Sequence, residues 1–309
     1  MRVFLARRFG QLAITVIGVL TLIFFLQRLT GDPTYLLVPD TATQGDIDAM
    51  RHTLGFDRPL AAQYLGFLQQ MLRFDLGNSV VQNVPVSTII ASRLPYTLQL
   101  AAGALLVACG IGIPIGVMLA LLRETLVARM LAGLVFAAQS MPTFWSGILL
   151  IMIFAVTLGW LPPSSVGGIA HLVLPSIALG LLSMATFARI TRTAILDELT
   201  KDYVRSARAR GASQARLLLR HLARNASIPV ITVAAIEISN LLAGAVIVET
   251  VFAWPGLGQV TVQSILARDF MVVQGVVLLG ALVTIALNLF ADLMYSAVDP
   301  RIRLDGIRR

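Results

Sequence analysis

The stretch TLQLAAGALLVACGIGIPIGVMLALL, residues 97–122, contains no charged side chain. A helix needs about 20 mostly apolar residues to cross the hydrocarbon core of a bilayer, and this stretch is long enough. The whole chain carries 13% charged residues, whereas a soluble domain carries about 25%. The stretch therefore predicts a membrane-spanning helix.

Five further apolar runs flank this stretch, and together they predict an all-α polytopic membrane protein with six spans. The first run is too long for the apolar region of a signal peptide, and no A-x-A cleavage pattern follows it, so we interpret it as a retained helix. Cys109 is the only cysteine, which excludes an intramolecular disulfide. The predicted spans are residues 9–29, 97–122, 130–158, 172–190, 226–248 and 271–296, with a permease core at 97–296.

Arginine and lysine are distributed unequally between the segments that connect the spans. If residues 1–8 lie inside the cell, then so do the loop of residues 191–225 and the tail of residues 297–309. The 24 basic residues then all lie inside except Arg28, Arg51, Arg58, Arg73, Arg93 and Arg268. This pattern predicts that both termini are cytoplasmic, and that the net charge of +8 reflects topology rather than nucleic-acid binding.

Two long segments, residues 30–96 and 249–270, are predicted to lie outside. The first has apolar residues at helical spacing, which predicts helices that rest on the outer rim or cap the bundle, not a solvated linker. In the second, Gly256 and Gly258 predict a tight turn. They do not predict a nucleotide-binding loop, because such a glycine-rich loop follows a β-strand. The apolar positions are Ile47, Met50 and Leu54 before Gly55, then Leu60, Tyr64, Leu68 and Leu72 after Pro59, and Ile89 and Ile90 after Pro85.

Glu237 and Asp292 are the only carboxylates within the predicted spans. A carboxylate at bilayer depth is costly, so it should face the bundle interior or a watery cavity. Glu237 either lines a substrate path or makes a structural hydrogen bond to another helix, and both interpretations stay open. For Asp292 we favour the structural role. The candidate path residues are Gln139, Ser140, Glu237 and Asn240.

The internal stretch DYVRSARARGASQARLLLRHLARN, residues 202–225, gathers six arginines. It predicts a helix that ends at Gly211 in a left-handed turn, and a second helix, capped by Ser213, that continues through Leu222. Small residues beside the arginines would let another surface approach closely, which favours a docking device. The alternative is ordinary positive-inside charge, or attraction to anionic lipid worth about 1 kcal/mol per cation.

RSARARG, residues 205–211, followed by HLARN, residues 221–225, resembles the cytoplasmic loop of importer-type ABC permeases, in which Glu-Ala-Ala precedes a glycine. Arg205 occupies the position of the glutamate in Glu-Ala-Ala, and Arg224 occupies a position at which many relatives have a proline. Further motifs, in the family's order, resemble the first (B-type) permease of dipeptide, oligopeptide and nickel importers. They are GDP (31–33), RPLAAQYL (58–65), DLGNSV (75–80), RLPYTLQLA (93–101), SMPTFW (140–145), ETVFAWPGLG (249–258) and DPRIR (299–303).

The resemblance implies a type I ABC importer permease in a bacterial inner membrane. Its partners would be a second homologous permease, two cytoplasmic ATPases that bind ATP and magnesium, and an extracytoplasmic binding protein. This chain would itself bind no cofactor or metal and catalyse no reaction. The implied ATPase-coupling residues are Tyr203, Arg205, Ser206, Ala207, Arg208, Ala209, Arg210, Gly211 and His221, and the implied docking or outer-cap residues are Tyr64, Asp75, Asn78 and Trp254.

Peptides are the cargo that the motifs favour, and nickel chelates, glutathione or opine-like compounds are the alternatives. A proton-coupled secondary transporter is a remote alternative, because two intramembrane acids and no clear internal repeat are poor support for it. A membrane-embedded enzyme is another, but the three histidines, His52, His171 and His221, lie far apart in the sequence.

Overall fold

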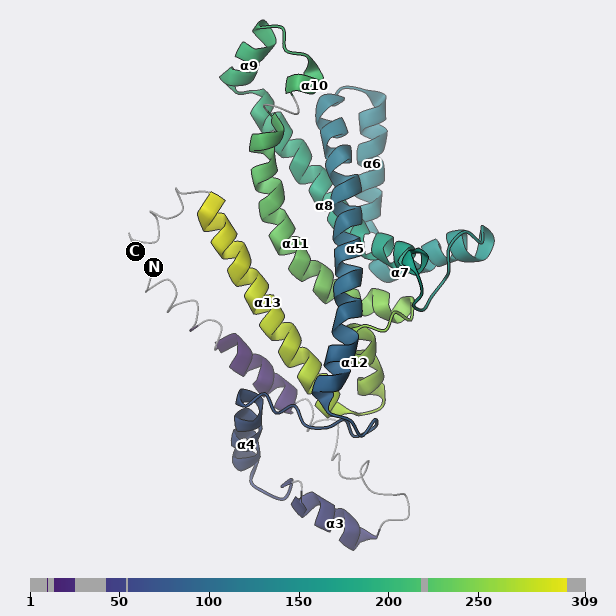
Figure 1. The fold of residues 1–309 in the computed structure, drawn as a ribbon, viewed down its shortest axis with the longest axis vertical. Helices are drawn as coiled ribbons and strands as arrows, with labels where there is room; N and C mark the ends of the chain where they lie inside the picture. The colour runs from purple at the N-terminus through teal and green to yellow at the C-terminus, as the bar shows by residue number, and fades with distance from the viewer. Residues whose placement is uncertain (1–9, 11–13, 26–42, 54, 218–221, 299–309) are drawn as a thin grey trace. The chain divides into compact units, whose positions relative to one another are not determined.

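The computed structural model describes residues 10, 14–25, 43–53, 55–217 and 222–298 (Figure 1). These residues form helices and no β-strand; one isolated bridge pairs Asn78 with Pro85. The chain divides into two compact units, of which the first comprises residues 1–94 and 260–285 and the second comprises residues 95–259 and 286–309. The all-α membrane fold predicted from the sequence is confirmed by this architecture.

The helices are joined by short turns and by longer loops. After the helix Ile14–Phe25, the elements are α3 (Gln44–Thr53), α4 (Leu60–Leu72), α5 (Val86–Leu121), α6 (Leu126–Ser140), α7 (Thr143–Leu150), the π-helix η1 (Ile151–Thr157), α8 (Ile169–Leu199), α9 (Asp202–Ala209), α10 (Gln214–Leu217), α11 (Ala223–Val251), α12 (Leu257–Leu266) and α13 (Phe270–Val298).

Four helical segments are long and apolar enough to cross a membrane: α5, α8, α11 and residues 270–290 of α13. The predicted span at residues 130–158 is different, because α6 and the α7–η1 segment meet at 109°. Pro142 lies at this bend; a proline has no N–H to donate and disfavours helical geometry at the residue before it, Met141. Counting the bent pair as one span gives five spans among the described residues. The described part of the first predicted span, Ile14–Phe25, is shorter than a helix needs to be to cross a membrane.

In the first unit, α4 packs against the helix Ile14–Phe25. The phenol of Tyr64 stacks edge-on against Phe24, and a hydrogen bond of 2.6 Å joins its hydroxyl to that of Thr21. Phe67 and Met71 complete the apolar contact on the same face of α4. The predicted outer helical segment therefore has its own packed core.

The apolar stripe that we expected along α4 lies only partly in this core. Leu60 and Leu72 are exposed, whereas Tyr64 and Leu68 pack inward. An α-helix has 3.6 residues per turn, so positions repeating every four residues drift around the axis, and the two ends leave the packed face. Phe67 and Met71, one residue before Leu68 and Leu72, fill the face instead.

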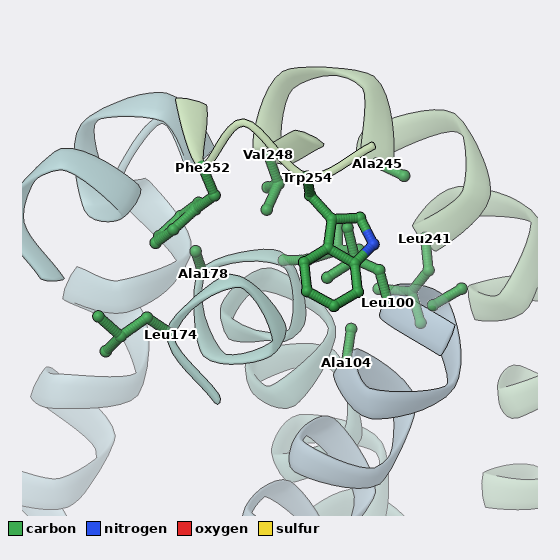
Figure 2. Close-up of a cluster of buried hydrophobic side chains, with 11 residues drawn as sticks. Leu100, Ala104, Leu174, Ala178, Leu241, Ala245, Val248, Phe252 and Trp254 are labelled. Carbon is green, nitrogen blue, oxygen red and sulfur yellow. The ribbon is translucent and has the colours of Figure 1, made fainter. Parts of the chain in front are cut away.

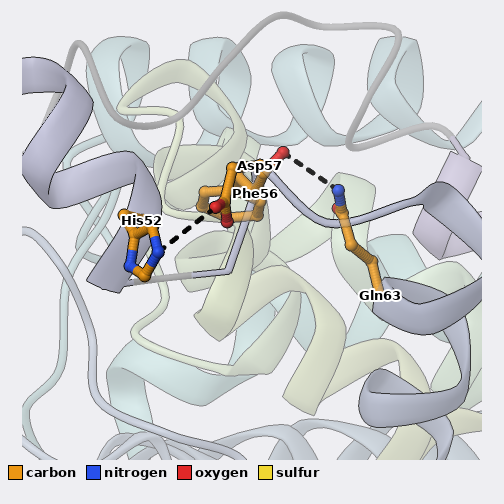
Figure 3. A network of polar contacts seen from close by, with 4 residues as sticks. All are labelled: His52, Phe56, Asp57 and Gln63. Carbon is orange, nitrogen blue, oxygen red and sulfur yellow. Dashed lines mark hydrogen bonds and ion pairs between the residues drawn. The ribbon is translucent and has the colours of Figure 1, made fainter.

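The turn between α3 and α4 is fixed by backbone and side-chain bonds. Gly55 has a φ of +70°, as its predicted helix-ending role requires. Leu54, which we expected on the apolar face before this glycine, lies outside the described residues. The amide of Gln63 donates to the carbonyl of Phe56 at 3.0 Å, and His52 lies 3.6 Å from the carboxylate of Asp57 (Figure 3). These contacts hold α3 close to the first turn of α4.

The core of the second unit lies where α5, α8 and α11 meet. The rings of Phe252 and Trp254 lie over aliphatic side chains from these helices (Figure 2). The backbones of α5 and α8 approach closely: a Cβ on Gly112 would lie 2.5 Å from the carbonyl oxygen of Met184, and one on Gly116 would lie 2.5 Å from that of Ala188. Small residues at such contacts are typical of membrane helix pairs.

Candidate functional site

The loop between α8 and α11 contains the predicted turn at Gly211 and the predicted cap at Ser213. The second helix, which we expected to continue through Leu222, is α10 (Gln214–Leu217), and residues 218–221 lie outside the described residues. Gly211, with a φ of +78°, ends α9: its N–H donates to Arg208 O at 2.9 Å, and the N–H of Ala212 donates to Ala207 O at 3.1 Å. These are the two hydrogen bonds of a Schellman motif. The hydroxyl of Ser213 then accepts the N–H of Arg216 and caps α10. Within the second unit, α9 and α10 lie beyond the ends of α8 and α11 (Figure 1).

The residues of α9 divide between an exposed face and a buried one. Val204 and Ala207 are buried in an apolar cluster that joins α9 and α10 to α5, α8 and α11; its other buried members are Ala120, Ala194, Ile195, Leu217, Leu222 and Ala226. The exposed residues of the predicted coupling set are Arg205, Ser206, Arg208, Ala209, Arg210 and Gly211. Ala207 therefore does not share the exposed face of Ser206 and Ala209 that we expected for docking. His221 lies outside the described residues.

Tyr203 turns its hydroxyl toward the bundle rather than outward. The hydroxyl donates to the carboxylate of Glu198, near the end of α8. The amide of Asn225, in the first turn of α11, donates to the same carboxylate oxygen and also to the Tyr203 hydroxyl, both at 3.3 Å. Burial, and then the hydrogen bond to Glu198, raise the pKa of Tyr203 above its usual value, which keeps the phenol protonated as a donor.

Glu237 belongs to α11, and its carboxylate is directed toward α8; the residue is 8% exposed. The hydroxyl of Ser183 on α8 donates to its carboxylate at 2.5 Å, and Asn240, one turn further along α11, donates at 3.4 Å. The structure therefore brings two of the four candidate path residues together and adds Ser183. Ser140, at the end of α6, donates to Phe136 O within its own helix, and Gln139 is half-buried beside it.

A second buried carboxylate, that of Glu249, was not singled out by the sequence. Its side chain is fully buried, and it accepts hydrogen bonds from the hydroxyl of Thr97 at 2.7 Å and from the N–H groups of Gly258 at 2.6 Å and Gln259 at 3.0 Å. Thr97 in turn accepts the N–H of Leu257 at 2.8 Å. Glu249 thus fixes the first turn of α12 against α5 and α11, where free N–H groups at a helix start favour a negative charge.

The glycines of ETVFAWPGLG leave room for this arrangement. A Cβ on Gly256 would lie 2.1 Å from the Glu249 carboxylate, and one on Gly258 would lie 2.4 Å from Cα of Val246. Gly256 precedes α12 and Gly258 lies in its first turn, so at both positions the absence of a side chain lets the backbone approach the buried carboxylate and α11.

Comparison with known proteins agrees with this arrangement. Residues 112–304 match the family described as "Binding-protein-dependent transport system inner membrane component", and residues 1–101 match the N-terminal component of the same systems. The chain belongs to this permease family. The membership confirms the resemblance seen in the motifs and makes the chain a multi-pass inner-membrane permease of an ABC importer, a class that works with ATPases and substrate-binding proteins.

The relatives of this permease match it over nearly its whole length. The "Di/tripeptide transport system permease protein DppB" of Pseudomonas aeruginosa is 38% identical over 97% of this chain and 98% of its own. The "Dipeptide transport system permease protein DppB" of Escherichia coli K12 is 36% identical over the same shares. A "Putative peptide transport system permease protein" of Brucella abortus is 38% identical over 99% of this chain and 100% of its own.

Solved ABC transporters share the fold of this permease. An inward-facing structure of the MetNI methionine ABC transporter covers 69% of this chain and 97% of its own, with a TM-score of 0.58 and 21% identity. An amino acid ABC transporter crystallised with histidines covers 67% of this chain and 92% of its own, with a TM-score of 0.51 and 20% identity. The likeness confirms the predicted type I importer fold.

The residues predicted to dock a binding protein or to cap the permease lie in different environments. Asp75 and Asn78 are exposed, in a loop that the buried Asp269 holds through the hydroxyl of Ser79 at 2.5 Å. Tyr64 is half-buried in the contact with Thr21 described above. Trp254 is 2% exposed, and its indole N–H donates to Tyr96 O at 2.8 Å. Trp254 therefore lies in the core of the second unit, and its role in docking or in the outer cap stays a prediction.

Proposed function

We propose that this chain is the non-catalytic permease subunit of a peptide importer and forms the translocation path together with a second homologous permease. The observation that carries the cargo class is the similarity to permeases named for dipeptide and tripeptide transport, over nearly the full length of both chains. Nickel chelates, glutathione and opine-like compounds remain the alternatives. ATP and magnesium bind to two partner ATPases, and an extracytoplasmic protein delivers the cargo.

The exposed face of α9 is the surface that docks to an ATPase. Support comes from its arginines, which project from a helix anchored by an apolar base, and arginine suits planar contacts to carboxylates and carbonyls. In this topology both termini and α9 lie on the cytoplasmic side. ATP binding moves α8 and α11 through α9, because it changes the relative stability of two bundle conformations. A cysteine placed at Arg208 tests the assignment, because it should cross-link to an ATPase subunit in the assembled importer.

Glu237 is the residue of the translocation path that recognises cationic cargo. In the conformation described, its carboxylate is satisfied by Ser183 and Asn240. A cargo ammonium group would replace the hydroxyl of Ser183 as a partner, and a charge-assisted hydrogen bond is stronger than a neutral one. An acid held at bilayer depth by one hydroxyl and one amide is suited to this exchange.

Replacing Glu237 with glutamine is expected to lower the uptake of lysine-containing or arginine-containing dipeptides about tenfold, as the loss of one charge-assisted hydrogen bond implies. Uptake of neutral dipeptides of similar size should change little, since glutamine keeps the volume and an acceptor for Ser183. The measurement is competitive uptake of labelled peptides into cells that express the complete importer. Glu124→Gln, which removes an exposed carboxylate, is the matched control. An equal loss for all cargoes, or no loss, would assign Glu237 a structural role.

A further inference from the structure

We propose that Glu198, Tyr203 and Asn225 form a hydrogen-bonded clamp that fixes α9 to the ends of both α8 and α11. Through this clamp, a displacement of α9 moves the two long helices together. The three are positioning residues that act through α9. The inference rests on the proposed docking of α9 to an ATPase and adds the residues that transmit the movement.

The clamp joins three elements that are separated in sequence. Glu198 precedes the last residue of α8, Tyr203 follows the first residue of α9, and Asn225 lies in the first turn of α11. One carboxylate oxygen of Glu198 accepts from both the Tyr203 hydroxyl and the Asn225 amide, and the same amide reaches the Tyr203 oxygen. Each residue contacts the other two, so losing any one of them weakens the link between α8, α9 and α11.

The apolar cluster beneath α9 cannot perform this role alone. Val204 and Ala207 bury the inner face of the helix against Leu217, Leu222 and Ala226. Apolar burial is non-directional, so it specifies the orientation of α9 less strictly than a hydrogen bond does. Hydrogen bonds depend on both distance and angle, and they fix α9 in rotation and along its axis. The cluster keeps α9 attached, and the clamp sets its orientation.

The exposed arginines of α9 remain available for the partner. Arg205 forms an ion pair of 4.0 Å with Asp202, and both side chains are largely exposed. An exposed pair of this kind contributes little to stability. The contacts that orient α9 are made by Tyr203 to α8 and α11, whereas the docking groups are the arginines of α9, so variants can separate attachment to the ATPase from transmission.

The test is Tyr203→Phe in the complete importer, reconstituted in liposomes with its second permease, ATPases and binding protein. This change removes one hydroxyl and keeps the ring. We expect the number of cargo molecules imported per ATP hydrolysed to fall about threefold or more, as the loss of one partly buried hydrogen bond to a charged group implies. The ATPases should co-purify in the same amount as with the wild-type chain. Thr193→Val is the matched control, because its hydroxyl donates to Arg189 O within the same helix.

Two further variants separate a clamp from general stabilisation. Glu198→Gln retains an acceptor for Tyr203 and should keep most of the transport per ATP, whereas Glu198→Leu should lose at least as much as Tyr203→Phe. The double variant Tyr203→Phe/Asn225→Ala should be no worse than the worse single variant, because residues of one network are not additive. These comparisons remain decisive if Tyr203→Phe itself is produced in low yield.

Wild-type transport per ATP in Tyr203→Phe, or losses that simply follow protein yield, would overturn the clamp. Additive losses in the double variant would overturn it as well. The proposed docking fails by a separate result: a cysteine introduced at Arg208 that forms no cross-link to an ATPase, in an importer whose Tyr203, Glu198 and Asn225 are unchanged. If the cross-link forms and Tyr203→Phe is fully coupled, docking stands and the clamp is rejected.

Discussion

Replacing Glu249 with alanine is expected to destabilise the permease by on the order of 3 kcal/mol and to abolish uptake. The change leaves the hydroxyl of Thr97 and the N–H groups of Gly258 and Gln259 without their buried acceptor, and each buried donor without a partner costs about 1–3 kcal/mol. The first turn of α12 would then separate from α5 and α11. Thermal unfolding of the purified chain in detergent, together with uptake in cells, measures both effects.

The conservative variant Glu249→Gln should be considerably less harmful. Its carbonyl oxygen can accept the two N–H groups, while its amide can donate to the hydroxyl oxygen of Thr97. Glu124→Ala removes an exposed carboxylate and should leave both stability and uptake unchanged. Equal stability of Glu249→Ala and the wild-type chain would show that Glu249 does not hold α12 in place.

The same substitution at two glycines of α5 is expected to have opposite effects. Gly112→Ala places a methyl group 2.5 Å from Met184 O and 3.0 Å from Cβ of Phe187, so α5 and α8 must separate. Overpacking of this kind costs about 1–3 kcal/mol. Gly110→Ala meets nothing within 4 Å, and should stabilise α5 by up to about 1 kcal/mol, because alanine is the better helix former.

The two glycine variants control for each other, since they lie two residues apart in one helix and receive the same methyl group. Comparison of their unfolding temperatures in detergent isolates the contact between α5 and α8. Transport should fall in Gly112→Ala, because the separated helices change the bundle that must rearrange. If the two variants shifted the unfolding temperature in the same direction, the close approach of α5 and α8 would be wrong.

The long apolar helices could be predicted from the sequence because their signal is local. Residues 97–121 of the predicted run lie within α5, although the helix begins earlier, at Val86, because Pro95 is accommodated inside it. The bend at Pro142 also had a local signal, but the length of the apolar run concealed it. The Gly211 turn and the Ser213 cap were predictable because each depends on residues a few positions away.

The contacts that organise the sites could not be predicted in the same way, because they join distant residues. Glu249 meets Thr97 across 152 positions, and Asn225 meets Glu198 across 27. The sequence shows acids at the ends of two spans, yet it does not show which hydroxyl, amide or backbone group reaches them. Ala207 illustrates the same limit, since small size is compatible with close docking and with burial in the bundle.

The most direct test of the account is a cysteine cross-link from α9 to an ATPase subunit. Cys109 is first replaced by serine, and a cysteine is introduced at Arg208, or at Glu124 as an exposed control outside α9. We predict that a short reagent, thiol-reactive at one end and amine-reactive at the other, joins the cysteine at position 208 to a lysine of an ATPase subunit, with a yield that changes when ATP is bound. Position 124 should give a much lower yield. Equal yields from both positions, or none from position 208, would contradict the assignment of α9 as the coupling surface.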